Sequence, residues 1–267
     1  MKFFNKIKNT YPTIIHANGV WDPTVRNILD KINLRYIQGD IFECFHQNDQ
    51  EIDLNSKIFH FNKDNEPLDS SIGIYTWNNK AFRDKWIFEI ICEINGLDYM
   101  NLIKTKEFKT FDKLTSINLE IKRLKSNNSS IKYLFCADSK DVIFTEHPNR
   151  FIKKFLIEQN KKMIINAETN DYPNNITQLE QSNPLPFKYL NSGAYIAEIN
   201  FLEKFTDLCL SFKEEYSNYL RHDLHALDQA LFKKSYELLK EECVLDINSD
   251  LFLCLYGCDQ SWIDITP

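Results

Sequence analysis

Short apolar runs that end in polar residues recur along the chain, and segments with helical spacing lie between them. The runs predict buried strands near 13–15, 72–76, 99–104, 131–135, 163–166, 187–190, 194–199, 244–247 and 251–256. Apolar residues at helical spacing predict helices over about 80–94, 111–125, 150–161, 200–220 and 225–240. This alternation favours an α/β domain with a mainly parallel, Rossmann-type sheet flanked by helices.

Two details of the helices can be predicted from the same pattern. Asn78 or Asn79 is the expected N-cap of the first helix, because a short polar side chain there can accept a backbone N–H. The second helix should bury one apolar side, made by Leu114, Ile117, Leu119, Ile121 and Leu124.

The stretch 131–144 (IKYLFCADSKDVIF) is the clearest candidate for a functional site. Its apolar run breaks at Asp138 and Asp141 and resumes at Val142. The carboxyl end of a buried strand is where open α/β sheets bind ligands. Two carboxylates beside a phosphate would suit Mg²⁺ or Mn²⁺, which prefer hard oxygen ligands. The alternative is a plain polar turn in which Asp138 caps the next segment.

Further polar breaks lie at the ends of predicted strands, at His16-Ala17-Asn18-Gly19, Thr76-Trp77 and Asn191-Ser192-Gly193. Asp228 lies inside a helical pattern. Together they would supply an imidazole, a small-residue turn for close backbone approach and a further carboxylate. The alternative for His16 is a hydrogen-bonded loop residue, with Gly19 serving only the turn.

Composition narrows the choice of function. The chain has 267 residues, 43% of them hydrophobic, and a net charge of −6, which argues against a general nucleic-acid binder. The 7 cysteines form no C-x-x-C pair, so buried reduced thiols are expected and structural zinc is not. No signal-peptide core and no apolar run of roughly 20 residues is present, so a soluble, cytoplasmic location is the default expectation. Neither a G-x-x-x-x-G-K-S/T nor a G-x-G-x-x-G pattern is found.

Taken together, these segments resemble the glycosyltransferase domain of the collagen lysyl hydroxylase/glycosyltransferase family, and more loosely other nucleotide-sugar transferases of GT-A type. The resemblance covers most of 72–257 together with 11–30. The segments that carry it are LFCADSKDVIF (134–144), KYLNSGAYIAE (188–198), LDQALFKKSY (227–236), VLDINSDLFLCLYG (244–257), HANGVWDPT (16–24), IGIYTW (72–77) and FDKLTSINLE (111–120). The resemblance implies a GT-A-like fold.

The resemblance also implies a site. His16, Asp138 and Asp141 would hold Mn²⁺, or Mg²⁺, against the diphosphate of UDP-glucose or UDP-galactose. Asp228, beneath the reacting carbon, and Asn191, beside the sugar, would be the catalytic residues. The donor would be bound by Thr76, Trp77, Lys113, Ser139, Asn18, Gly19, Ser192, Gly193 and Gln229. The expected acceptor is hydroxylysine or galactosyl-hydroxylysine in a collagen-like protein.

Three features depart from the family. Leu227 replaces the first acid of an acidic pair, and Lys140 stands where the family usually has an aromatic residue. The His-x-Asn-Gly segment comes first instead of last, which predicts a circularly permuted single domain over 1–267. Residues 1–30 would supply the element that is C-terminal in the family, 31–56 would be a connection, and the two termini would lie close together. The alternative is that 1–30 is the remnant of a tandem copy, with His16 acting between domains or chains.

Two other functions stay open at the level of the sequence. One is a GT-A transferase that acts on another glycan or a lipid-linked acceptor. The other is a non-catalytic nucleotide-sugar-binding module, which the change at Leu227 makes conceivable. Release of UDP from a UDP-sugar separates both transferases from the binding module. The oligomeric state is left open as well.

Overall fold

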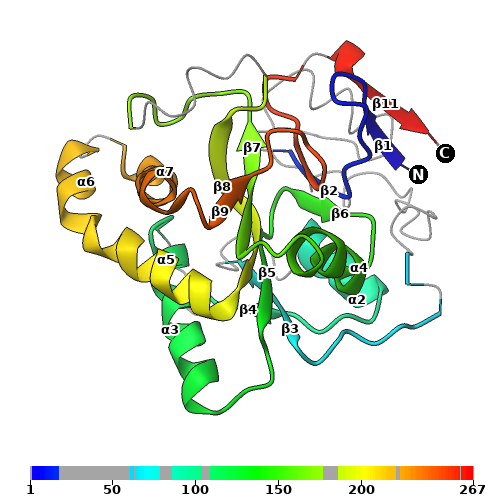
Figure 1. The fold of residues 1–267 in the computed structure, drawn as a ribbon, viewed down its shortest axis with the longest axis horizontal. Coiled ribbons are helices and arrows are strands. Elements are labelled where there is room, and N and C mark those ends of the chain that lie inside the picture. The colour runs from blue at the N-terminus through cyan, green and yellow to red at the C-terminus, as the bar shows by residue number, and fades with distance from the viewer. Residues whose placement is uncertain are drawn as a thin grey trace, which may run out of the picture.

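A six-stranded sheet forms the centre of the computed structural model, which describes residues 2–17, 61–62, 64–78, 86–103, 109–176, 186–220, 223–258 and 260–266 (Figure 1). Its strand order is β4-β3-β5-β8-β7-β9. The strands are β3 (Ile72–Trp77), β4 (Met100–Asn101), β5 (Tyr133–Asp138), β7 (Met163–Glu168), β8 (Tyr189–Glu198) and β9 (Cys243–Leu245). Within this sheet β8 runs antiparallel to β5 and β7, and the other neighbouring pairs are parallel. The predicted mainly parallel α/β fold is confirmed.

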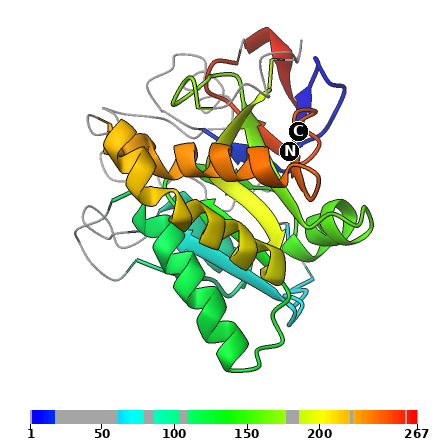
Figure 2. The same cartoon turned by 60° about the vertical axis from the view of Figure 1, so that its left-hand side comes forward.

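Helices cover both faces of this sheet. One face carries α3 (Asp112–Ser126), α5 (Ile199–Ser211) and α7 (Leu227–Leu239), which lie side by side (Figure 2). The other carries α2 (Ile87–Ile94) and α4 (Pro148–Ile152) (Figure 1). The remaining helical segments are the π-helix η2 (Lys153–Ile157), α6 (Lys213–Tyr219) and the 3-10 turns η3 (Leu224–Ala226) and η4 (Gln260–Trp262).

A second, smaller sheet adjoins the carboxyl end of β5. It has the order β10-β2-β6, from β10 (Phe252–Cys254), β2 (Ile14–His16) and β6 (Val142–Phe144). β2 runs parallel to β10 and antiparallel to β6, so a segment from the start of the chain is built into the middle of this sheet. The segment beside the Asp138–Asp141 turn therefore comes from far away in the sequence.

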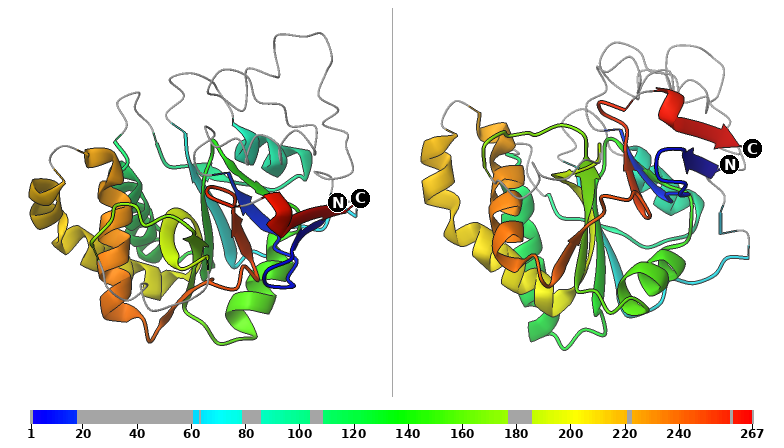
Figure 3. Two further views of the ribbon diagram at one scale, coloured as in Figure 1. Left: turned by 90° about the horizontal axis from the view of Figure 1, so that it is seen from above. Right: turned by 45° about the horizontal axis from the view of Figure 1, so that its top comes forward.

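The two ends of the chain also pair with each other. β1 (Lys2–Asn5) and β11 (Ile263–Thr266) form an antiparallel ribbon in which Lys2 lies opposite Thr266. The termini accordingly lie next to one another at the periphery of the molecule (Figure 3). Neither strand was predicted, since each is short and is stabilised by a partner at the other end of the sequence.

The helix predictions need correction at several points. The N-cap of α2 is Trp86 rather than Asn78 or Asn79, and Asn78 instead donates to the Glu89 carboxylate. Leu119 is 62% exposed, because it lies between the buried positions Ile117 and Ile121 and so points away from their side of α3. The predicted helix 150–161 ends earlier, as α4 and η2, and the predicted helix 200–220 breaks at residue 212.

The predicted turn at Asn191-Ser192-Gly193 is wrong. These residues lie inside β8, which continues from Tyr189 to Glu198. The irregularity falls in the pairing instead, where the register between β7 and β8 shifts between Ile165 and Ala167. The polar residues thus mark a stretch of strand that faces a pocket, and not the end of a strand. The predicted strand 99–104 is reduced to the two residues of β4.

The described cysteines are all buried and form no disulfide among themselves, and Cys44 lies outside the described residues. No helix in the described ranges has the length and apolar character that a membrane crossing requires.

Candidate active site

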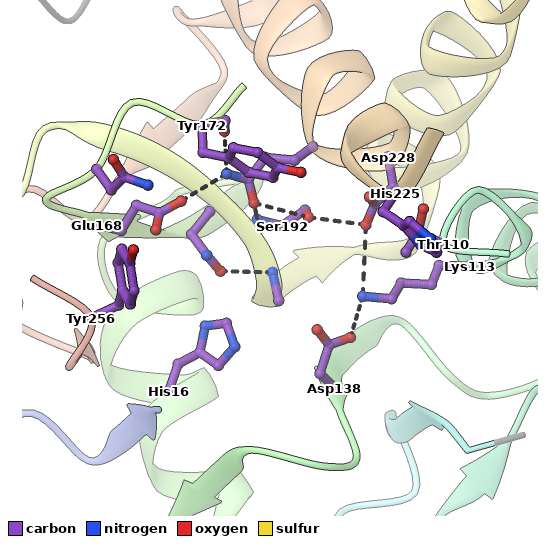
Figure 4. Close-up of a pocket in the computed structure, with 14 residues that line it drawn as sticks. His16, Thr110, Lys113, Asp138, Glu168, Tyr172, Ser192, His225, Asp228 and Tyr256 are labelled. Atoms are coloured by element: carbon purple, nitrogen blue, oxygen red, sulfur yellow. Dashed lines mark hydrogen bonds and ion pairs between the residues drawn. The ribbon is translucent and has the colours of Figure 1, made fainter. Parts of the chain in front are cut away.

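A pocket of about 420 Å³ opens where β7 and β8 meet the start of α7 (Figure 4). Most of the residues that line it are of polar or charged type. The lining residues are His16, Thr110, Lys113, Asp138, Glu168, Asn170, Tyr172, Asn191, Ser192, Gly193, His225, Asp228, Gln229 and Tyr256. Eight of the predicted site residues are among them, although they come from five separate elements of the sequence.

Strand pairing brings His16 to the two aspartates. In the register of β2 and β6, His16 lies opposite Val142, and the backbone N–H of Ala17 donates to the carbonyl of Asp141 at 2.8 Å. The His16 Nε2 is 3.4 Å from Asp141 Oδ1. One ligand atom from each of His16, Asp138 and Asp141 lies within 4.8 Å of the other two. In the described part of the chain, this is the one such group of three that could hold a metal ion.

The donor set fits a divalent cation. An imidazole nitrogen with two carboxylates suits Mn²⁺, and the carboxylates alone would also suit Mg²⁺. Gly193 makes room for this arrangement, since a Cβ at that position would overlap the His16 ring. Burial raises the pKa of Asp138, whereas for Asp141 the His16 imidazole outweighs burial and lowers the pKa.

Lys113 connects the metal-binding group to the rest of the pocket. Its Nζ lies 2.5 Å from Asp138 Oδ1 and 3.6 Å from Asp228 Oδ2. Burial alone would lower the pKa of Lys113, but these two carboxylates outweigh burial and raise it. Lys113 is therefore a fixed positive charge between two acids of the pocket.

A chain of hydrogen bonds runs from Asp228 across the back of the pocket. Ser192 Oγ donates to Asp228 Oδ2 at 3.1 Å, and Ser192 N donates to Gln229 Oε1 at 3.2 Å. Gln229 Nε2 in turn donates to Glu168 Oε1 at 2.7 Å. Asp228 and Gln229 lie in the first turn of α7. The start of this helix therefore positions the Asp228 carboxylate directly and the Glu168 carboxylate through Gln229. Burial raises the pKa of Glu168 to about 7.

A sequence model of the PLOD GT domain matches residues 104–264, which is more than half of the chain. The chain belongs to the PLOD glycosyltransferase domain family. The resemblance drawn from the motifs is thereby confirmed, and the protein is a glycosyltransferase. Among solved structures, a glycosyltransferase involved in the glycosylation of the major capsid of PBCV-1 is similar, with 12% identity and a TM-score of 0.42. The similarity covers 71% of this chain and 95% of that one. The comparison with curated proteins gives no match.

Two buried residues of this glycosyltransferase were missed from the sequence. Glu168 is the last residue of β7 and lines the pocket, in the same kind of position as Asp138 at the end of β5. Asn166, inside β7, places its Nδ2 3.2 Å from His16 Nδ1 and so faces the second nitrogen of the imidazole. A polar residue at or near the end of an apolar strand was the available signal for both.

Other predicted donor-binding residues of the glycosyltransferase do not line this pocket. Thr76 and Ser139 are buried and use their hydroxyls on backbone carbonyls, of Ala137 at 2.8 Å and of Trp77 at 2.7 Å. The Trp77 indole donates to Ser116 Oγ at 2.9 Å. Asn18 and Gly19 lie outside the described residues.

Proposed function

We propose that this glycosyltransferase moves glucose or galactose from a UDP-sugar to a hydroxylysine-linked acceptor on a collagen-like protein, with Mn²⁺ or Mg²⁺ held by His16, Asp138 and Asp141. The observation that carries the proposal is the grouping of the His16 imidazole with the carboxylates of Asp138 and Asp141, beside a pocket that Asp228 also lines. Membership of the PLOD glycosyltransferase family supports the donor and acceptor classes.

The proposed roles of the metal ion and of Lys113 follow from their positive charge. When bound, a divalent cation would neutralise the negative charge that develops on the leaving diphosphate. Lys113, already held between Asp138 and Asp228, would bring a second positive charge to the phosphate oxygens. Thr76, Trp77 and Ser139 would form the nucleoside end of the donor site, next to the carboxyl end of β5.

The sugar would lie between β8 and the start of α7. Asn191, Ser192 and Gly193 border this space, and Ser192 and Lys113 hold the Asp228 carboxylate in place. An acid fixed in this way would stabilise positive charge on the reacting carbon or orient the acceptor hydroxyl. Leu227 removes one of the two adjacent acids expected from the family, yet the pocket holds Glu168 in addition to Asp138 and Asp228.

We also propose that residues 1–267 form one circularly permuted domain, with 1–30 in place of an element that is C-terminal in the family and 31–56 as a connection. The placement of β2 beside β10, with His16 opposite Cys254, supports this proposal. The 3.4 Å separation of His16 and Asp141 within a single chain supports it over the tandem-copy alternative.

UDP release tests the proposed function. The purified protein is incubated with a panel of UDP-sugars, with Mn²⁺ or with chelator, and with and without a hydroxylysine-containing collagen-like peptide. We expect release that is confined to UDP-glucose or UDP-galactose, is lost with chelator, and increases with the peptide. Asp138→Ala and Asp141→Ala should each abolish it, while Asp207→Ala, which changes a half-exposed acid on α5, should not. Full activity in either site variant would contradict the metal assignment.

A further inference from the structure

The segment 168–173, which continues from the end of β7, alternates between two environments. Its even-numbered residues, Glu168, Asn170 and Tyr172, line the pocket. Its odd-numbered residues do not line the pocket and are bonded to other parts of the chain; the Thr169 hydroxyl donates to the carbonyl of Tyr256 at 2.8 Å. The segment bends after Glu168, and the Tyr172 N–H donates to the carbonyl of Asn170 at 3.1 Å. A segment with alternate residues on a pocket and the others anchored forms a wall of that pocket, and its position depends on the anchors.

The strongest anchor on the α7 side is Lys233, one helical turn after Gln229. Its Nζ donates to Asp171 Oδ1 at 2.6 Å and to the carbonyl of Pro173 at 3.3 Å. It also lies 5.6 Å from the centre of the Tyr189 ring. The Lys233 side chain is 0% exposed, and a buried ammonium is unfavourable unless it is paired. The 168–173 segment supplies both hydrogen-bond partners.

Two more contacts hold the same segment. Gln229 Nε2 donates to the carbonyl of Tyr172 at 2.5 Å, and the Tyr172 hydroxyl donates to Asp223 Oδ2 at 2.7 Å. Gln229 and Lys233 are four residues apart and therefore lie on one side of α7. The segment is thus held by α7 through Gln229 and Lys233, and by Asp223, which precedes that helix.

We propose that Lys233 is a positioning residue that holds the 168–173 segment as the acceptor-side wall of the pocket. Tyr172 lies across the pocket from Asp138, where the metal and the donor diphosphate would bind (Figure 4). The 168–173 segment, on the side of the pocket opposite the donor, would therefore contact the acceptor. The assignment to the acceptor rests on the proposed function, whereas the anchoring itself does not.

Lys233→Met is the informative variant, because it keeps an unbranched side chain of similar length and removes only the ammonium. It should fold, since the Asp171 side chain is 23% exposed and can turn to water. Asp171→Ala is expected to be the less stable variant, because it leaves the buried ammonium without a carboxylate. The double variant should recover part of the melting temperature that Asp171→Ala loses. Lys234→Met, at the neighbouring and more exposed lysine, is the matched control.

Amide hydrogen exchange reports on the anchoring without any substrate. We expect exchange in residues 169–173 to become about tenfold faster or more in Lys233→Met, with β5 and α3 unchanged and with Lys234→Met like the wild type. Unchanged exchange in 169–173, or a uniform increase throughout the protein, would overturn the proposal.

Kinetics then test the acceptor assignment. With a hydroxylysine-containing collagen-like peptide, Lys233→Met should raise KM for the peptide about fivefold or more, while UDP release to water stays within about twofold of wild type. An equal loss of both reactions would overturn the acceptor-side role. A wild-type protein that releases no UDP would overturn the proposed function alone, and the exchange comparison would still decide whether Lys233 anchors the segment.

Discussion

At the scale of single residues, the contact between Gly193 and His16 constrains the candidate metal site most directly. β8 passes so close to the imidazole that a Cβ at Gly193 would overlap its ring, and the same Cβ would lie 3.0 Å from Asn191 Oδ1. The Gly193 N–H also donates to that oxygen at 2.8 Å, which keeps the Asn191 side chain beside the glycine. Neither neighbour has room to retreat, because both are buried.

Gly193→Ala should therefore weaken Mn²⁺ binding by displacing His16. Loss of a correctly oriented ligand is expected to cost about tenfold or more in affinity. Calorimetric titration with Mn²⁺ alone would compare Gly193→Ala, His16→Ala and the double variant with the wild type. Because His16→Ala removes the ring that the new methyl group would meet, the double variant should bind no more weakly than His16→Ala. Additive losses in the double variant would contradict this account.

At the scale of elements, a turn between β9 and β10 holds the small sheet in place. The buried carboxylate of Asp246 accepts the backbone N–H groups of Asp250, Leu251 and Phe252, at 3.0, 2.9 and 2.8 Å. The carbonyl of Leu251 then accepts the N–H of Ile14 at 3.0 Å, at the start of β2. One side chain thus organises the approach of β10 to the strand that carries His16.

Asp246→Ala should destabilise the protein by about 3 kcal/mol, because it leaves buried backbone donors without an acceptor. Urea unfolding monitored by circular dichroism would measure the loss in the free energy of unfolding. Asp250→Ala is the control, since the side chain of Asp250 is exposed and only its backbone joins the turn. A loss as small as that of the control would show that Asp246 is not what holds the turn.

The elements also show what the sequence could and could not predict. Apolar runs located the central strands, because a strand buried on both faces needs a continuous apolar stretch. The continuity of β8 through Asn191-Ser192-Gly193 was missed, since small polar residues favour turns locally and only the pairing with β5 and β7 keeps them extended.

The same distinction holds for the site. Asp138 and Asp141 stand out because they interrupt an apolar run, and Glu168 has a weaker form of that signal. No neighbouring residue in the sequence distinguishes Lys233 from any other lysine of a helix. Its proposed role depends on Asp171, which is 62 residues away in the sequence. His16 and Asp228 also have partners that are distant in the sequence, and they were predicted only because their segments resemble those of the family.

At the scale of the whole molecule, the first and last strands of the described chain pair with each other. β1 and β11 pair over four residue positions, and β2 lies between β10 and β6. The first segment of the sequence is therefore held mainly by partners from the last. In such an arrangement the order of segments along the chain matters less than their contacts, which is the condition under which permutation is tolerated.

A circular permutant tests this view. Residue 267 is joined to residue 1 by a short Gly/Ser linker, which would turn the β1–β11 ribbon into a hairpin, and new ends are opened between Asp40 and Ile41. We expect this permutant to melt within about 5 °C of the wild type, because the linker adds no strain to paired strands, and to keep its Mn²⁺ affinity. Opening the same linked chain between Ser139 and Lys140 is the control, and it should abolish Mn²⁺ binding because it separates Asp138 from Asp141. If the first permutant fails to fold or to bind Mn²⁺, the present order of the segments is required, and the single-domain permutation would have to be abandoned.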